Sequence, residues 1–212
     1  MPPKAVSKKK HALPTFNIQA FPTPALESID LRMSYRIARG EQGVLTFEPY
    51  KSFLLPHWRF ATLPVAHQSS SNLNQAFDHY VKAGDLVGAD MARKFIQMGM
   101  TRAKRYANHK GGRKYDKSVR EQERNGGERT ELAKSDGHEG RDEKLEVSEH
   151  FKGIWRQCTS DEGYLALKEE FQREQKEWDK ATKKLKKEVK SEEDGDESNI
   201  KGEVKREDDG DG

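Results

Sequence analysis

The sequence predicts a small α+β domain with an N-terminal β-hairpin, about four helices and charged, disordered ends. Hydrophobic residues make up 33% and charged residues 35% of the 212 residues, whereas ordinary globular domains hold roughly 45–50% apolar and about 25% charged residues. Apolar side chains alternate in one early segment and recur at helical spacing in later ones. Part of the chain is therefore expected to fold, while the rest cannot pack.

The hairpin is expected over residues 35–47. Residues 35–39 (YRIAR) and 44–47 (VLTF) alternate in side-chain type, and Gly40 and Gly43 between them tolerate the positive φ of a tight turn. The aromatic stretch 53–60 that follows contains a proline, which favours an extended or irregular segment packed on the core.

Two helices are expected next. The first begins after the serines at 69–71, buries one face and ends at Gly84. The second covers residues 86–108 behind an Asp85 cap, and its small residues would let another element approach closely.

Two C-terminal helices are expected to close the core, one over residues 147–158 and one after the Ser160–Asp161 cap. Cys158 lies on the apolar stripe of the first and is expected to pack as a small hydrophobe. It is the only cysteine, which excludes an intrachain disulfide and indicates a reducing compartment. Because we find no signal peptide and no membrane span, we expect a soluble, intracellular protein.

Composition also predicts the domain organisation. Residues 1–24 form a basic, proline-rich head, and residues 181–212 form a Lys/Glu/Asp/Gly tail, both too poor in apolar residues to offset chain entropy. A single domain is expected over residues 25–180. Residues 117–146 have no aromatic side chain and are interpreted as a disordered insertion within it.

Five stretches of the predicted domain carry distinctive combinations of residues. They are residues 35–45 (YRIARGEQGVL), 48–51 (EPYK), 55–60 (LPHWRF), 90–95 (DMARKF) and 98–116, which ends in KGGRKYD.

These stretches resemble an uncharacterised family, domain of unknown function 4385, found in bacteria, bacteriophages and fungi. The resemblance covers residues 29–178 and implies no activity. The insertion at 117–146 is expected to be shorter in compact relatives, so it is not expected to belong to a shared function.

The most polarised stretch of the predicted core is basic. Residues 93–114 contain eight lysines or arginines and no acid. Such a helix and loop can lie along a phosphate backbone, with neighbouring aromatic rings for stacking. The candidate nucleic-acid-binding residues are Arg93, Lys94, Arg102, Lys104, Arg105, Lys110, Arg113 and Lys114.

The same cations have a simpler explanation. Lysine and arginine near a helix C-terminus oppose the helix dipole, and a polar helix face is commonly just solvated. Glycines that follow a helix also lie at the wrong end for anion capture. We therefore carry forward two interpretations, a nucleic acid or other polyanion as partner and plain solvation. The protein partners are unknown.

An enzyme is the alternative class, although the residues favour a non-enzymatic role. Glu48, Lys51, His57 and Arg59 are close enough in sequence to line a small-ligand pocket. No nucleotide-binding glycine motif, cofactor motif or metal-ligand spacing is present, so no cofactor and no metal is expected. A structural role for His57 is the competing explanation.

The tail contains three apolar-Lys-x-Glu motifs that resemble acceptor sites for the ubiquitin-like modifier SUMO. Their lysines are Lys190, Lys201 and Lys205, although a Lys/Glu-rich tail yields such matches by chance. Basic clusters at residues 8–10 and 183–187 are of the kind that nuclear import receptors bind. A mixed cytoplasmic and nuclear location is expected.

Overall fold

The computed structural model describes residues 13–203, with side-chain detail for residues 13–186. The described chain is helical, and the predicted α+β fold is wrong. The only β-type pairing within residues 13–203 is one antiparallel bridge between Tyr115 and Glu131. The helices are α1 (Pro24–Glu27), α2 (Ile29–Ser34), α3 (Tyr50–Leu54), α4 (Leu63–Ala83), α5 (Leu86–Asn108), α6 (Val119–Asn125), α7 (Arg141–Ser160) and α8 (Glu162–Glu203), with 3-10 turns η1 (Ile18–Ala20), η2 (Leu55–His57) and η3 (Lys110–Gly112).

The predicted hairpin is a compact run of turns. Gly40 and Gly43 do take positive φ angles of 68° and 81°, but the N–H groups of Thr46 and Phe47 both bond to the Gly43 carbonyl instead of to a partner strand. Tyr35 and Val44 are buried, and the Tyr35 ring meets that of Phe47 edge-on at 4.9 Å. The alternating pattern therefore reflects burial against helices, not strand pairing.

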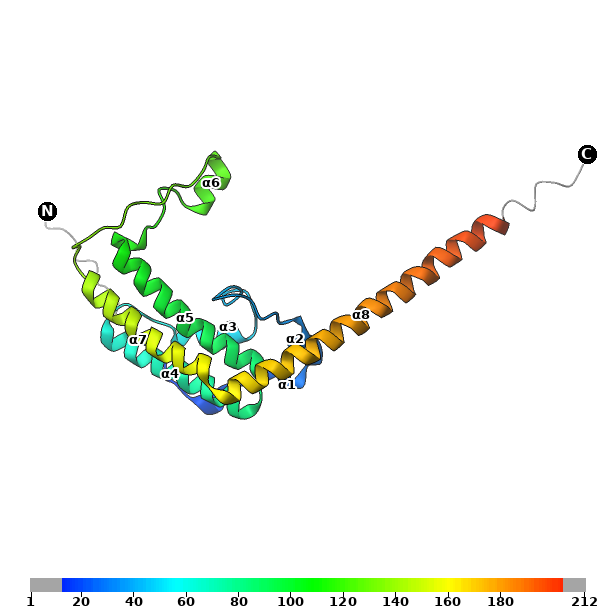
Figure 1. Ribbon diagram of the computed structural model, residues 1–212, viewed down its shortest axis with the longest axis horizontal. Helices are drawn as coiled ribbons and strands as arrows, with labels where there is room; N and C mark the ends of the chain where they lie inside the picture. Colours follow the sequence, from blue (N-terminus) through cyan, green and yellow to red (C-terminus); the bar gives the residue numbers. More distant parts are fainter. Residues whose placement is uncertain (1–12, 204–212) are drawn as a thin grey trace, which may run out of the picture. The chain divides into compact units, whose positions relative to one another are not determined.

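The centre of the fold is a bundle of α4, α5 and α7, which pack pairwise and lie side by side in Figure 1. α5 is the innermost helix, and its buried residues include Phe95 and Ile96. α7 contributes Phe151, which is fully buried. Burying an aromatic or large aliphatic side chain stabilises a fold by about 1.5–3 kcal/mol, so these residues hold the bundle together.

Two glycines on α5 set the helix spacing. A Cβ atom at Gly99 would lie 2.6 Å from the Phe151 ring, and one at Gly88 would lie 2.3 Å from the Tyr80 ring. No real Cβ atom sits that close to a ring carbon, so only glycine fits at either position. The prediction that small residues allow a close approach to α5 is confirmed.

The ends of the two long central helices were predicted with unequal success. Gly84 ends α4 in the left-handed conformation, and the Asp85 carboxylate caps α5 by accepting from Gly88 N–H at 3.0 Å, both as predicted. α4 begins at Leu63, however, earlier than the serines at 69–71. Ser69 faces inward and donates to the His57 carbonyl at 2.7 Å, so it bonds backbone from within the helix and does not cap it.

The remaining segments differ from expectation in detail. The stretch 53–60, expected to be extended or irregular, contains the end of α3 and the turn η2. The segment 117–146 contains α6, whose Ser118 and Glu121 form a capping box, and the first turn of α7. One compact unit ends at Leu167, and a second begins at Lys168, where the described part is the remainder of α8.

Candidate functional site

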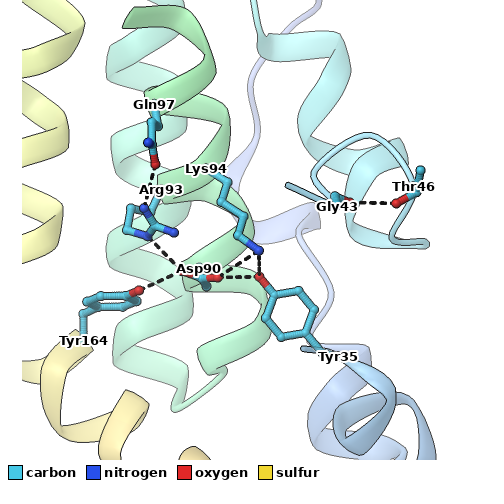
Figure 2. A network of polar contacts seen from close by, with 8 residues as sticks. All are labelled: Tyr35, Gly43, Thr46, Asp90, Arg93, Lys94, Gln97 and Tyr164. Atoms are coloured by element: carbon cyan, nitrogen blue, oxygen red, sulfur yellow. Dashed lines mark hydrogen bonds and ion pairs between the residues drawn. The ribbon is translucent and has the colours of Figure 1, made fainter. Parts of the chain in front are cut away.

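α5 carries two clusters of charged side chains, and the first surrounds Asp90 (Figure 2). Arg93 Nε donates to Asp90 Oδ1 at 2.8 Å, and Lys94 Nζ lies 3.3 Å from Oδ2. The Tyr164 hydroxyl donates to Oδ1 at 2.7 Å, and the Tyr35 hydroxyl donates to Oδ2. Lys94 Nζ also donates to the Tyr35 hydroxyl at 2.8 Å. We call this set the Asp90 network.

Burial and charge oppose each other in the Asp90 network. Asp90 is 0% and Lys94 1% exposed. Burial alone would raise the pKa of Asp90, but Arg93, Lys94 and the two tyrosines hold that pKa below its usual value. Burial lowers the pKa of Lys94 against the opposing pull of Asp90, and it raises the pKa of Tyr35. Asp90 is therefore an ionised carboxylate inside the protein.

The side chains of the Asp90 network bond one another, and they join three parts of the chain. Tyr35 follows α2, Asp90 lies on α5 and Tyr164 lies in the first turn of α8. Removing one partner of a buried ion pair costs about 3–5 kcal/mol. Arg93 and Lys94 were predicted to bind an anionic ligand, but the structure commits both to this network, and they are not part of the surface described next.

The second cluster lies at the C-terminal end of α5, where Lys104 is exposed and Arg102 and Arg105 are half-buried. Arg102, Lys104 and Arg105 line a hollow of about 470 Å³ together with Lys114 and Lys134. The hollow also contains two carboxylates, and each already has a partner. Glu131 is 3.1 Å from Lys114 Nζ, and Glu41 accepts from Thr101 Oγ1 at 2.6 Å.

A second hollow of about 370 Å³ lies beyond Arg105. Its cations are Arg105, Arg113, Lys117 and Arg129. The Arg129 guanidinium lies over the Tyr115 ring, 4.2 Å from its centre. The carboxylate in this hollow, Glu121, accepts from the Ser118 backbone N–H at 2.7 Å in the capping box.

Arg105 lines both hollows and joins them. Its Nε donates to the Gly112 carbonyl at 2.7 Å, which ties η3 back onto the end of α5. Gly112 has a φ of 71°, and a Cβ there would lie 2.5 Å from the Tyr106 ring, so this turn needs glycine. We call the two hollows together the basic surface. Its cations are Arg102, Lys104, Arg105, Arg113, Lys114, Lys117, Arg129 and Lys134.

Sequence reasoning missed three of these cations. Lys117, Arg129 and Lys134 belong to the segment interpreted as an insertion without function. That segment returns to α5, because Ser135 N–H bonds to the Asn108 carbonyl at 2.9 Å and the Tyr115–Glu131 bridge closes the loop. Lys110 was predicted to take part but lines neither hollow.

The alternative pocket does not assemble from its four predicted residues. Glu48 forms an ion pair with Lys51. His57 is buried against the Phe16 and Phe21 rings, and burial lowers its pKa.

Arg59 is the member of that set that lines a hollow, an apolar one of about 430 Å³ that Glu48, Lys51 and His57 do not reach. Its guanidinium donates to the carbonyls of Leu55 and Trp58 at 3.3 and 2.6 Å. Cys158 is buried as predicted, and burial raises the pKa of its thiol to about 12.

The predicted modification sites lie at the end of the chain. Lys190 and Lys201 belong to α8, whereas acceptor motifs are used in extended form. Lys205 and the basic cluster at residues 8–10 lie outside the described residues. Modification and nuclear import therefore stay predictions.

One protein-family model matches most of the chain. The model of the domain of unknown function DUF4385 matches residues 21–174. The chain belongs to the DUF4385 family. The predicted resemblance is thereby confirmed, and the DUF4385 match includes the Asp90 network and the whole basic surface. Comparisons with curated proteins and with solved structures found no match.

Between residues 13 and 203, no helix has both the length and the apolar composition needed to cross a membrane. The same residues hold no group of three or more His, Cys, Asp or Glu side chains placed to bind a metal ion.

Proposed function

We propose that this DUF4385 domain binds a nucleic acid through the basic surface. The observation that carries the proposal is the position of Arg105, which lines both basic hollows and so joins them into one extended surface. An extended row of cations suits a polymer of phosphates better than a single small anion.

The balance of charge supports the same proposal. Eight cations line the basic surface, against three carboxylates. Glu41, Glu121 and Glu131 each bond a neighbour within the protein, to Thr101, Ser118 and Lys114 respectively. Hydrogen bonds do not neutralise a carboxylate, but eight cations against three carboxylates still leave the basic surface with net positive charge, which can neutralise phosphates and release the counterions condensed on the nucleic acid.

Binding of this kind depends on the backbone of the nucleic acid and hardly on its sequence. Phosphate contacts position a ligand but carry no sequence information. The expected signature is weak sequence preference and a steep loss of affinity with salt.

Charge reversal of one exposed lysine tests the proposal. Lys104 on α5 and Lys82 on α4 are both exposed lysines, but Lys82 lies next to the α4–α5 turn, at the opposite end of α5 from the basic surface. Lys104→Glu and Lys82→Glu change the net charge equally. Fluorescence anisotropy with a labelled single-stranded oligonucleotide, at salt concentrations from about 50 to 200 mM, measures the affinity of each variant.

Lys104→Glu is expected to weaken binding several-fold at low salt and to reduce the slope of log affinity against log salt by about one. Lys82→Glu is expected to leave the slope unchanged. Equal losses in the two variants would mean that only net charge matters. Absence of binding by the unsubstituted protein at about 50 mM salt would refute the proposal.

A further inference from the structure

The apolar hollow of about 430 Å³ has aromatic walls on two sides. Trp58 and Phe60 come from the segment before α4, and Tyr106 comes from the last turns of α5. The Trp58 and Phe60 rings have centres 5.1 Å apart, and the Phe60 and Tyr106 rings meet edge-on at 5.5 Å. Tyr106 is 37% exposed, so the hollow opens to solvent.

Two cations lie at the edge of this aromatic hollow, and each donates hydrogen bonds to main-chain carbonyls. Lys144 Nζ donates to the Phe60 carbonyl at 2.9 Å and to the Ala61 carbonyl, and it lies 5.5 Å from the centre of the Phe60 ring. The Arg59 guanidinium bonds the Leu55 and Trp58 carbonyls. Carbonyl bonds fix these cations but do not neutralise them.

No carboxylate among the described residues lines the aromatic hollow. The acid next in sequence to Lys144, Glu143, accepts from Leu63 N–H at 3.0 Å at the start of α4. The hollow therefore combines flat apolar walls with net positive charge. That combination suits a planar, aromatic group attached to an anion.

The aromatic hollow adjoins the basic surface through one turn of α5. Tyr106 follows Arg105 in sequence, and the Tyr106 ring packs on Gly112, whose carbonyl accepts the Arg105 bond. The Tyr106 carbonyl also contacts His138 Nε2 at 3.1 Å. Neighbouring residues of α5, Arg105 and Tyr106, thus line the basic surface and the aromatic hollow respectively.

We propose that the aromatic hollow binds an unpaired base of a single-stranded nucleic acid whose phosphates lie on the basic surface. This proposal rests on the proposed function and adds to it a preference for single strands. A base stacked on an aromatic side chain commonly raises affinity by about tenfold. Stacking tolerates any base, because every base has a π face.

The test separates base binding from phosphate binding with two probes. One is a labelled oligothymidylate of ~12 nucleotides, within the usual site sizes for single strands. The other has the same length and sugar-phosphate backbone but carries abasic residues.

Phe60→Leu removes the ring and keeps an apolar side chain of similar size, and Phe60→Tyr keeps the ring. Circular dichroism and a urea midpoint confirm that each variant folds.

The unsubstituted protein is expected to bind oligothymidylate about tenfold more tightly than the abasic probe. Phe60→Leu should abolish that preference without changing affinity for the abasic probe, whereas Phe60→Tyr should retain it. Equal, salt-dependent binding of both probes by the unsubstituted protein would overturn the base site and leave the proposed function standing. A preference that survives Phe60→Leu would show that the base does not stack on Phe60, the ring that meets both Trp58 and Tyr106, and would overturn the base site as proposed. Binding of neither probe would refute the proposed function, and the base site with it.

Discussion

The two ends of α5 use the same residue types for opposite purposes. Near its N-terminus, Arg93 and Lys94 are buried and bonded to Asp90. About three turns later, Arg102 and Lys104 line an exposed hollow in which the acids are already engaged. The difference comes from a single carboxylate. Asp90 stands three and four residues before Arg93 and Lys94, on the same helix face, where i,i+3 and i,i+4 partners meet.

This comparison shows that charge counted along a sequence is a poor guide to charge on a surface. An acid one helical turn away can remove two cations from any interface. Arg102 and Lys104 have no acid one turn away on α5, although Glu149 on α7 lies near Lys104. Cations of the first kind are expected to affect stability and those of the second kind the proposed binding, so the two ends of α5 should respond differently to substitution.

The largest expected effect is on the Asp90 network. Asp90→Asn leaves Arg93 and Lys94 buried without a counter-charge, so the free energy of unfolding should fall by about 3–5 kcal/mol. Urea denaturation measures it. Asp78→Asn on α4 is the control, because burial raises the pKa of Asp78 and its charge is not favoured in the folded protein. Similar losses of unfolding free energy in the two variants would show that Asp90 contributes no more to stability than Asp78 does.

The stability difference between the unsubstituted protein and Asp90→Asn should depend on pH. The folded pKa of Asp90 lies below its unfolded value of about 3.9. The stabilisation is therefore fully present above about pH 4 and is lost as pH falls through the folded pKa. Denaturation of both proteins between about pH 7 and 3 checks this. A gap that stays constant to the lowest pH would contradict an ionised Asp90.

A substitution between the two ends of α5, where Gly99 packs against Phe151 of α7, gives a smaller effect. Gly99→Ala places a methyl group against the fully buried Phe151 ring, and overpacking of this kind costs about 1–3 kcal/mol. Gly153→Ala on α7 is the matched change, because a Cβ there meets nothing within 4 Å. It should stabilise the protein by up to about 1 kcal/mol, since alanine favours helix. Thermal unfolding of both variants should show shifts of opposite sign.

The exposed end of α5 should show almost no effect on stability. Lys104→Gln is expected to change the free energy of unfolding by no more than about 0.5 kcal/mol, as surface substitutions commonly do. The same urea titration serves as the measurement. A loss of several kcal/mol would mean that Lys104 belongs to the structural part of the helix.

Local signals were sufficient to predict parts of this fold. Gly84 and Asp85 separate α4 from α5 because helix-ending and helix-capping residues act within one turn. The hairpin prediction failed because alternation at Tyr35 and Val44 shows only that both side chains are buried. A single sequence does not say whether the partner is a strand or a helix.

The basic surface could be predicted only in part for a similar reason. Arg102, Lys104, Arg105, Arg113 and Lys114 were found because they lie in one continuous stretch. Lys117, Arg129 and Lys134 were not, because they belong to the segment 117–146, which was interpreted as an insertion and which returns to α5. Arg93 and Lys94 were included because the stretch was counted from residue 93 and left out Asp90.

A pair of identical substitutions on α5 tests the division between its two ends. Arg93→Gln and Arg102→Gln remove the same charge nine residues apart, and each variant is assayed for its free energy of unfolding and for its affinity for a single-stranded oligonucleotide at about 50 mM salt. Arg93→Gln is expected to lower stability by about 3 kcal/mol and to keep the affinity, whereas Arg102→Gln should lower the affinity and keep the stability. If folded Arg93→Gln binds as weakly as Arg102→Gln, or if Arg102→Gln binds as tightly as the unsubstituted protein, α5 is not divided in this way.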